Sequence, residues 1–255
     1  VMTIPELFSL QQQYFAASRT KDINTRKENL KTLKKTLNDH RLDIYKAFKD
    51  DLNKSEFEVD ASELSMCIME IDYFLKHLKS LSKRKKVGTN LLNFPSKNHL
   101  YYEPYGVTLV IAPWNYPLQL ALVPAIGALA AGNTVILKPS EYAPKVAEVL
   151  KVISDYFEDG LFSVVTGGIK ENQELLDLPF DYIFFTGSTN VGRIVMEKAS
   201  HHLTPLTLEL GGKSPCVVTA TADLDIAAHR ITWAKFLNAG QTCVAVDYIY
   251  VDKKV

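Results

Sequence analysis

The sequence has few of the features that mark specialised classes of protein. Its 255 residues include three cysteines, Cys67, Cys216 and Cys243, with no CxxC pair and no Cys/His cluster. This argues against a disulfide-built domain and against a zinc site. Glycine and proline are at ordinary levels, which excludes a collagen-like chain, and the formal net charge is zero. Neither half of the chain is basic enough to indicate nucleic acid. We therefore expect no metal and no nucleic-acid partner.

The N-terminus lacks the basic and then apolar layout of a signal peptide, so we expect a cytoplasmic protein. Residues 104–137 contain no charged side chain, and such a run is long enough to cross a membrane. However, it is interrupted by Pro104, Pro113, Pro117 and Pro124, and a Leu/Ala-rich piece lies between two β-branched pieces. This pattern predicts strand, helix and strand inside a parallel α/β sheet, and no membrane segment.

Apolar residues predict a helical N-terminal part followed by alternating strands and helices. They recur at spacings of three and four from Leu30 to Leu52 and from Leu64 to Leu81, as in two amphipathic helices. Strands are expected at 107–112, 134–138, 162–165, 182–186, 206–210, 215–219 and 248–252, and helices at 118–131, 142–157, 189–200 and 225–237. We divide the chain into a helical segment (1–86), a connector or edge ribbon (87–104), an α/β domain with a mostly parallel sheet (105–209), and the beginning of a second α/β domain (210–255).

One predicted strand runs directly into a glycine turn and the start of a helix, over Phe184–Gly192. The first N–H groups of a helix lack intrahelical partners, and the helix dipole is positive there, so this site suits an anion such as a dinucleotide pyrophosphate. The segment is not the GxGxxG fingerprint, because only Gly187 and Gly192 are present. A tight turn without any ligand would explain the glycines equally well.

Polar side chains follow two other predicted strands, at the edge where open α/β sheets bind ligands. Lys138 and Glu141 come after the strand at 134–138, and a carboxylate there can accept hydrogen bonds from ribose hydroxyls. Glu141 could instead cap the next helix. Asn115 lies between Pro113 and Pro117, where a rigidly held amide could stabilise an oxyanion. The alternative is a simple turn between strand and helix.

Two further residues offer a base and a nucleophile. Glu209 stands in an apolar strand pattern, and burial raises the pKa of a carboxyl group toward the range of a general base. It could instead cap backbone amides. Cys243 follows Gly240, and a thiol is nucleophilic even when only partly ionised. A lone cysteine is more often a core residue, which we expect of Cys67 and Cys216. No histidine near Cys243 indicates a Cys–His pair, which argues against a cysteine protease.

Together these segments closely resemble the aldehyde dehydrogenase superfamily. The stretches Phe185–Gly192 and Thr204–Pro215 are similar to its class 3 branch, which includes fatty and aromatic aldehyde dehydrogenases. The match covers about residues 101–250. The residues that carry it are Ala112-Pro113-Trp114-Asn115-Tyr116-Pro117, Lys138-Pro139-Ser140-Glu141, Phe185-Thr186-Gly187-Ser188-Thr189, Leu208-Glu209-Leu210-Gly211-Gly212-Lys213 and Gly240-Gln241-Thr242-Cys243.

The resemblance implies oxidation of a small-molecule aldehyde to a carboxylic acid with NAD(P)+, without a metal. Cys243 would form a thiohemiacetal and then a thioester, the Asn115 amide and the Cys243 N–H would hold the oxyanion, and Glu209 would activate water. The α/β domain at 105–209 would be a Rossmann-like NAD-binding domain. Cofactor contacts are expected from Pro113, Trp114, Lys138, Glu141, Gly187, Ser188, Thr189, Asn190, Val191, Gly192, Leu210 and Gly211.

Glu141 beside a ribose favours NAD, because a 2′-phosphate would meet a carboxylate, although NADP stays possible. The resemblance also implies a homodimer at full length. Val246 departs from the family, which usually has proline there, and family members continue well beyond residue 255. We therefore expect the N-terminal part of a longer enzyme. The alternative is a catalytically incomplete nucleotide-binding fragment or a structural partner.

Overall fold

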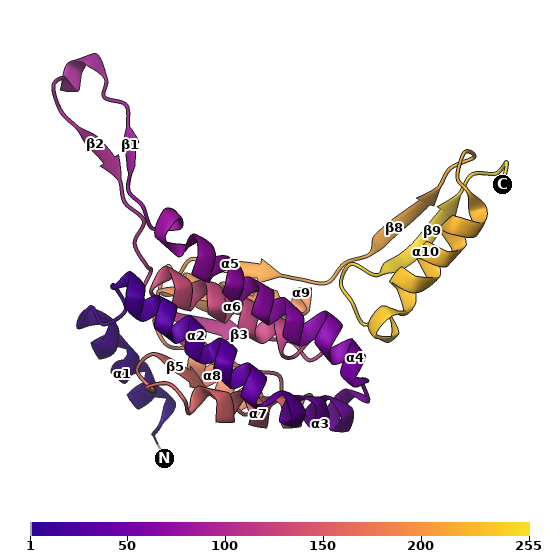
Figure 1. Cartoon of the computed structure of the whole chain (residues 1–255), viewed down its shortest axis with the longest axis horizontal. Helices are drawn as coiled ribbons and strands as arrows, with labels where there is room; N and C mark the ends of the chain where they lie inside the picture. Colours follow the sequence, from indigo (N-terminus) through magenta and orange to yellow (C-terminus); the bar gives the residue numbers. More distant parts are fainter. Residues whose placement is uncertain (1) are drawn as a thin grey trace.

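The computed structural model describes residues 2–255. Its main body is a parallel sheet with helices on both faces (Figure 1). A thin hairpin extends from one end of this body, and a small unit of one helix and two strands extends from the other, carrying the C-terminus (Figure 1). The α/β class predicted from the sequence is therefore confirmed.

The sheet has the strand order β5-β4-β3-β6-β7, and all four strand pairs are parallel. Every residue of the two central strands β3 and β4 is buried, as expected of β-branched strands covered on both faces. The chain first builds the sheet outward from β3 to β5, and then returns to the other side of β3 to add β6 and β7. The carboxyl ends of β3 and β6 therefore flank a topological switch point. The strands are β3 (Val107–Ile111), β4 (Thr134–Lys138), β5 (Phe162–Val164), β6 (Tyr182–Thr186) and β7 (Leu206–Glu209).

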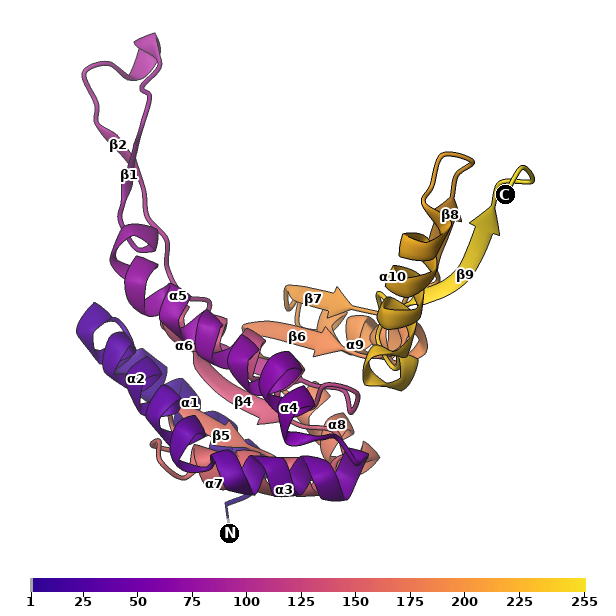
Figure 2. The same cartoon turned by 45° about the vertical axis from the view of Figure 1, so that its right-hand side comes forward.

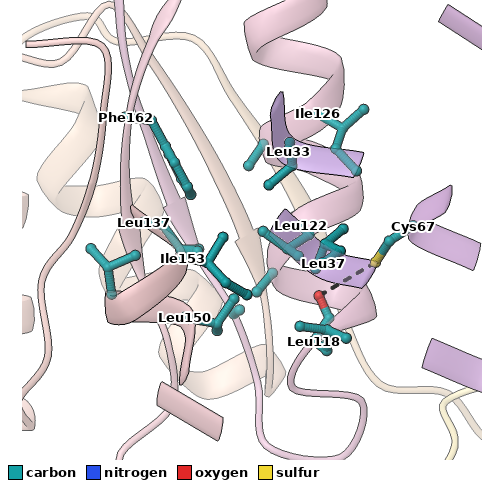
Figure 3. Packing of buried hydrophobic residues seen from close by; sticks show 14 of the residues in the cluster. Leu33, Leu37, Cys67, Leu118, Leu122, Ile126, Leu137, Leu150, Ile153 and Phe162 are labelled. Atoms are coloured by element: carbon teal, nitrogen blue, oxygen red, sulfur yellow. Dashed lines mark hydrogen bonds between the residues drawn. The ribbon is translucent and has the colours of Figure 1, made fainter. Parts of the chain in front are cut away.

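The larger of two apolar cores lies on the face covered by α2, α3, α5, α6 and α7. There, Leu33 and Leu37 of α2 meet Leu122 and Ile126 of α6, and Phe162 of β5 completes the packing (Figure 3). Removing these side chains from water is the main stabilising contribution on this face. The helices are α2 (Ile23–Asp39), α3 (Arg41–Leu52), α5 (Ser65–Leu81), α6 (Gln119–Ala131) and α7 (Pro144–Ser154).

The opposite face of the sheet is covered by α1 (Ile4–Ala16), α8 (Ile169–Leu176) and α9 (Thr189–Ser200). Alternate side chains of β3 supply the two cores, with Leu109 on this face and Val110 on the other. Helices thus lie on both faces of the sheet, and they bury β3, β4 and β5 most fully. These helices do not cover the ends of the strands, which is where a ligand can reach the sheet.

Two units project from the body. The hairpin pairs β1 (Lys85–Val87) antiparallel with β2 (Asn98–Leu100), and a short 3₁₀ helix (Leu91–Asn93) lies at its tip. The C-terminal unit pairs β8 (Ser214–Val218) in parallel with β9 (Val246–Val251), and α10 (Leu224–Phe236) packs beside β9. Figure 2 shows this unit standing clear of the parallel sheet. The predicted edge ribbon at 87–104 corresponds to most of the hairpin.

From residue 105 onward, each predicted strand and helix is present and begins and ends within three residues of its predicted bounds. The N-terminal prediction needs correction. The helix expected through 30–52 is two helices that meet at His40, and α4 (Glu56–Val59) with a π-helical turn (Asp60–Leu64) precedes α5. Helix α1 falls in the segment predicted to be helical, although its bounds were not predicted, and α8 was not predicted, because only a few of their residues are buried and the periodic signal is short.

The uncharged run forms β3, α6 and β4. Pro124 lies inside α6 and does not end it, as the predicted helix at 118–131 requires, so this proline does not interrupt the run as the other three were expected to do. Burial of the apolar residues around Pro124 outweighs the one backbone hydrogen bond that proline removes. None of the helices between residues 2 and 255 combines the length and the apolar character that a membrane crossing requires.

Candidate active site

A cavity of about 260 Å³ lies at the topological switch point, between the segments that follow β3, β6 and β7. Four of the five segments singled out in the sequence contribute to it. The predicted nucleophile Cys243 and the predicted oxyanion donor Asn115 both line this cavity. Its wall consists of Pro113, Trp114, Asn115, Leu120, Thr186, Gly187, Ser188, Leu210, Gly211, Gln241, Thr242 and Cys243.

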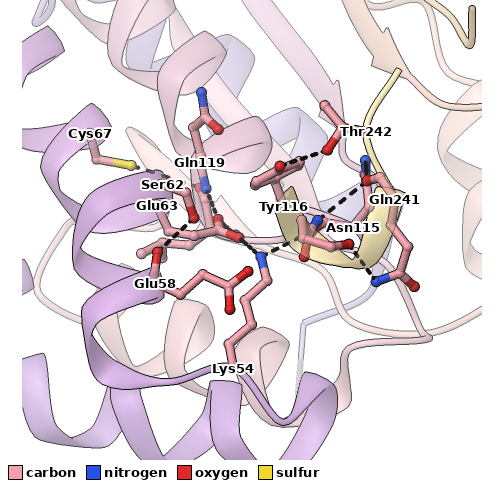
Figure 4. A network of polar contacts seen from close by, with 12 residues as sticks. Lys54, Glu58, Ser62, Glu63, Cys67, Asn115, Tyr116, Gln119, Gln241 and Thr242 are labelled. Atoms are coloured by element: carbon pink, nitrogen blue, oxygen red, sulfur yellow. Dashed lines mark hydrogen bonds and ion pairs between the residues drawn. The ribbon is translucent and has the colours of Figure 1, made fainter. Parts of the chain in front are cut away.

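Direct hydrogen bonds join the Asn115 loop to the Cys243 loop, although the bonded residues Asn115 and Gln241 are 126 positions apart in sequence. The side-chain Nδ2 of Asn115 donates to the carbonyl oxygen of Gln241 at 2.8 Å. In return, Asn238 Nδ2 donates to the carbonyl oxygen of Asn115, also at 2.8 Å. The hydroxyls of Tyr116 and Thr242 lie 2.7 Å apart (Figure 4). These three contacts set the position of the Asn115 carboxamide relative to the loop that carries Cys243.

The backbone before Cys243 adopts an uncommon conformation. Asn238, Ala239 and Gly240 have φ values of 52°, 54° and 78°, a left-handed conformation that glycine and asparagine tolerate but that strains alanine. The buried Asn238 side chain stabilises this turn by donating to the carbonyl oxygens of both Asn115 and Gln241. The turn directs the chain so that Cys243, which is exposed, reaches the cavity.

The double glycine Gly211-Gly212, which follows β7, lies against the backbone of the Cys243 loop. A Cβ atom added to Gly212 would lie 2.6 Å from the carbonyl oxygen of Cys243, so only glycine fits there. The segment after β7 thus passes directly against the nucleophile loop. Leu210 and Gly211 line the cavity, whereas Glu209 does not, and the predicted contact of Leu210 and Gly211 with a cofactor stays a prediction.

Glu209 is exposed, so its predicted burial is wrong. It is the last residue of β7, which is the edge strand of the sheet, and no further strand of the described residues covers that side. The backbone of Glu209 is well held, because its carbonyl oxygen accepts a hydrogen bond from the N–H of Gly187 at 2.9 Å. This contact places Glu209 next to the glycine turn. The role of Glu209 as base stays a prediction.

The segment predicted to meet a pyrophosphate begins α9. Gly187 and Ser188 line the cavity, and the Ser188 hydroxyl caps the helix by accepting from the N–H of Val191 at 3.3 Å. Thr189, Asn190 and Val191 are exposed in the first turn. Gly192 is buried, and a Cβ atom there would lie 2.8 Å from Leu210. Gly192 thus lets α9 pack closely on the segment after β7, and direct contact with a cofactor stays a prediction.

A second cavity of about 290 Å³ lies at the carboxyl ends of β4 and β5, and Glu141, Thr166 and Gly167 are part of its wall. Lys138 is buried nearby. Its Nζ donates to the carbonyl oxygen of Pro139 at 2.7 Å and lies 3.7 Å from Glu141 Oε2. Burial lowers the pKa of Lys138, and the Glu141 carboxylate opposes that shift. Both cavities open along the same edge of the sheet, an arrangement that suits an elongated dinucleotide.

The model of the aldehyde dehydrogenase family matches residues 4–255. The chain belongs to the aldehyde dehydrogenase family. The class 3 resemblance is confirmed by its relatives, which include aldehyde dehydrogenase family 3 member B3 of Mus musculus, 45% identical over 96% of this chain and 51% of that protein. Another relative is 4,4'-diaponeurosporen-aldehyde dehydrogenase of Staphylococcus aureus, 49% identical over 99% of this chain and 55% of that protein.

Solved structures of other family members have the same fold. The substrate-bound aldehyde dehydrogenase AldH of Staphylococcus aureus superimposes with a TM-score of 0.96 at 48% identity, over 99% of this chain and 56% of that one. The NAD+ complex of an aldehyde dehydrogenase from Bacillus cereus gives a TM-score of 0.88 at 25% identity, over 98% and 52% of the two chains. The chain therefore spans about half the length of the relatives that it matches.

The structure also reveals a buried ion pair in this aldehyde dehydrogenase chain that sequence reasoning missed. Lys54 Nζ donates to Glu63 Oε1 at 2.8 Å, and their side chains are 3% and 0% exposed (Figure 4). Nothing in the sequence distinguishes these two from the many surface lysines and glutamates of the helical segment. Only packing against the loop after β3 removes them from water.

We expect this pair to give the protein a specific dependence of stability on pH. Burial raises the pKa of Glu63 to about 7, although Lys54 and the N–H groups of Gln119 and Leu118 act in the opposite direction. The pair therefore carries both charges only above about pH 7; between pH 4.5 and about 7, the unfolded state ionises at this position while the folded state keeps its proton. The free energy of unfolding should therefore fall as pH rises through this window, by up to about 3 kcal/mol, and then level off.

Urea unfolding at a series of pH values, followed by circular dichroism, measures this slope. The double variant Lys54→Met/Glu63→Gln removes both charged groups and is expected to lose this part of the pH dependence. The other titratable groups near Glu63 are the thiol of Cys67, whose pKa burial also raises, and the phenol of Tyr116 beside Lys54. Neither is altered in the double variant. Equal slopes in the two proteins would show that Glu63 does not titrate in this range.

Proposed function

We propose that the chain supplies the nucleophile, an oxyanion donor, the base and the cofactor site of an NAD(P)-dependent aldehyde dehydrogenase. The observation that carries this proposal is the common cavity at the switch point, which Asn115 and Cys243 both line. A carboxamide and a thiol at the carboxyl edge of a parallel sheet match the demands of carbonyl chemistry beside a dinucleotide. Membership of the family and the names of the relatives support the same activity.

In the proposed reaction, Cys243 Sγ adds to the carbonyl carbon of the aldehyde, and the carbonyl oxygen becomes an oxyanion. One N–H of the Asn115 amide is used by Gln241, which leaves its second N–H for the oxyanion, together with the backbone N–H of Cys243. A donor of this kind contributes about 3 to 4 kcal/mol. Once hydride has left this thiohemiacetal for the bound cofactor, the carbon is a thioester of Cys243. Glu209 then takes a proton from a water molecule, whose oxygen attacks the thioester carbon and releases the acid, with Cys243 leaving as the thiolate.

The nicotinamide cofactor, when bound, supplies the acceptor for the aldehyde hydride. The residues present fit such a group: the first turn of α9 offers backbone N–H groups to a pyrophosphate, and Ser188 and Gly187 line the cavity beside it. Glu141 borders the neighbouring cavity, where its carboxylate suits ribose hydroxyls and disfavours a 2′-phosphate. We therefore propose NAD as the preferred cofactor, with NADP as the alternative.

The test uses the purified protein in the form made from its own gene. It is incubated with NAD+ or NADP+ and with aliphatic aldehydes of increasing chain length or an aromatic aldehyde, and absorbance of the reduced cofactor is followed. We expect turnover, and a higher kcat/KM with NAD+ than with NADP+. Tight binding of NAD+ without oxidation of any aldehyde would instead identify a nucleotide-binding protein without this activity.

A further inference from the structure

Lys54 and Glu63 contact the backbone of the Asn115 loop at three places. Glu63 Oε2 accepts hydrogen bonds from the N–H groups of Leu118 and Gln119, at 3.2 and 2.9 Å, and so caps the start of α6. Lys54 Nζ donates to the carbonyl oxygen of Asn115 at 3.2 Å, in addition to its bond to Glu63 (Figure 4). The pair therefore holds both the predicted oxyanion donor and the helix that follows it.

The carbonyl oxygen of Asn115 accepts from two side chains that come from opposite directions in the sequence, Lys54 and Asn238. Two donors on one carbonyl oxygen restrict rotation of that peptide plane. The ammonium group of Lys54 also lies 4.4 Å from the ring centre of Tyr116, the next residue. The held peptide plane fixes the point from which the Asn115 side chain projects, and the bond from its Nδ2 to the Gln241 carbonyl oxygen sets its direction at the cavity.

A buried charge pair is an expensive way to cap a helix. Desolvation of two ions costs several kcal/mol each, and well-packed apolar residues often stabilise a protein as much. An uncharged serine or asparagine could accept from the same N–H groups. What the charge pair adds is a third, charge-assisted hydrogen bond to the Asn115 carbonyl, directed from a buried and rigid ammonium group.

We propose that Lys54 and Glu63 are positioning residues, which hold the Asn115 amide in the direction needed to bind the oxyanion formed at Cys243. This inference rests on the proposed function of Asn115. Neither residue lines the cavity, so they act through Asn115 and do not touch the substrate. Asn115 depends on this positioning, because displacement of its amide by a fraction of an ångström weakens its hydrogen bond to the transition state.

The double variant Lys54→Met/Glu63→Gln tests this inference without leaving a buried unpaired charge. The carboxamide introduced in place of Glu63 keeps an oxygen to accept from Leu118 and Gln119, so the variant removes mainly the hydrogen bond to Asn115. We expect kcat to fall about ten- to a hundredfold, with KM for NAD+ unchanged. The matched control is Lys34→Met/Asp72→Asn, which removes a half-exposed ion pair between α2 and α5 and should leave kcat unchanged.

A double-mutant cycle with Asn115→Ala distinguishes a positioning role of the pair from a merely structural one. All variants are measured at a temperature well below their thermal midpoints. Asn115→Ala alone should lower kcat by about 10²- to 10³-fold. If the pair acts through Asn115, adding Lys54→Met/Glu63→Gln to Asn115→Ala should lower kcat by less than about twofold more.

Two results would overturn the inference, and they differ from each other. If the pair variant lowers kcat by the same factor with and without Asn115, or not at all, Lys54 and Glu63 do not position the amide. If Asn115→Ala alone keeps full activity, the proposed oxyanion role fails, and the positioning role fails with it. The thermal midpoints identify any variant whose loss of activity comes from unfolding.

Discussion

Replacement of Cys243 by alanine should abolish aldehyde oxidation, with kcat reduced by at least about 10⁴-fold. The expectation follows from chemistry, because the thiol is far more nucleophilic near neutral pH than the hydroxyls of Thr186, Ser188 and Thr242, which also line the cavity. Cofactor affinity should change little, since the segment that begins α9 is untouched by this substitution. Steady-state formation of reduced cofactor and calorimetric binding of NAD+ measure the two quantities.

A suitable control is Cys216→Ala, which removes a half-buried thiol from β8, outside the cavity wall. This variant should keep the activity of the unchanged protein. If Cys243→Ala retains activity to within about tenfold, the sulfur is not the nucleophile and the covalent reaction proposed above is wrong. Loss of activity in both variants, with lowered thermal midpoints, would point to damage of the C-terminal unit.

The second large effect is expected for Glu209→Gln, which keeps the shape of the side chain and removes its basicity. The first half of the reaction does not need this carboxylate, so each active site should still produce one reduced cofactor in a rapid burst. Release of the acid requires an activated water, and the steady-state rate after the burst should fall about 10²- to 10⁴-fold. Stopped-flow absorbance resolves the two phases.

Glu197→Gln on the exposed side of α9 is the matched control, and it should leave both phases unchanged. A burst that disappears together with the steady-state rate would assign Glu209 to the first half of the reaction. An unchanged steady-state rate would show that another base activates the water. The experiment is informative because Glu209 is exposed. Burial therefore does not supply the property expected of a general base, and the role of Glu209 has to be measured.

Much of the central fold could be predicted from the sequence, because the signals are local. The β-branched runs of β3 and β4 and the Leu/Ala-rich run of α6 differ in periodicity, so the element types were correct and their bounds were nearly so. The break at His40 was not predictable from the same pattern. The spacing of apolar residues continues through His40, and the boundary between two helices does not alter which residues are apolar.

The candidate site was predicted in part. The motifs after β3, β6 and β7 lie at the carboxyl ends of parallel strands, where a ligand site is expected, and they meet at one cavity. The loop of Cys243 joins them there from before β9, which no strand end indicated. The burial of Glu209 was predicted wrongly because an apolar strand pattern does not reveal whether that strand lies at an edge. The Lys54–Glu63 pair gave no signal at all, since charged residues in an amphipathic segment are normally solvated.

The sequence by itself determined the class of fold, the family and the identity of the candidate nucleophile, because these depend on local periodicity and on residues at set spacings. Only the tertiary structure decided that the Asn115 loop is held between Lys54 on one side and the Cys243 loop on the other. That arrangement depends on contacts between segments 61 to 126 residues apart. Such contacts form through packing of whole elements, and no short stretch of sequence records them.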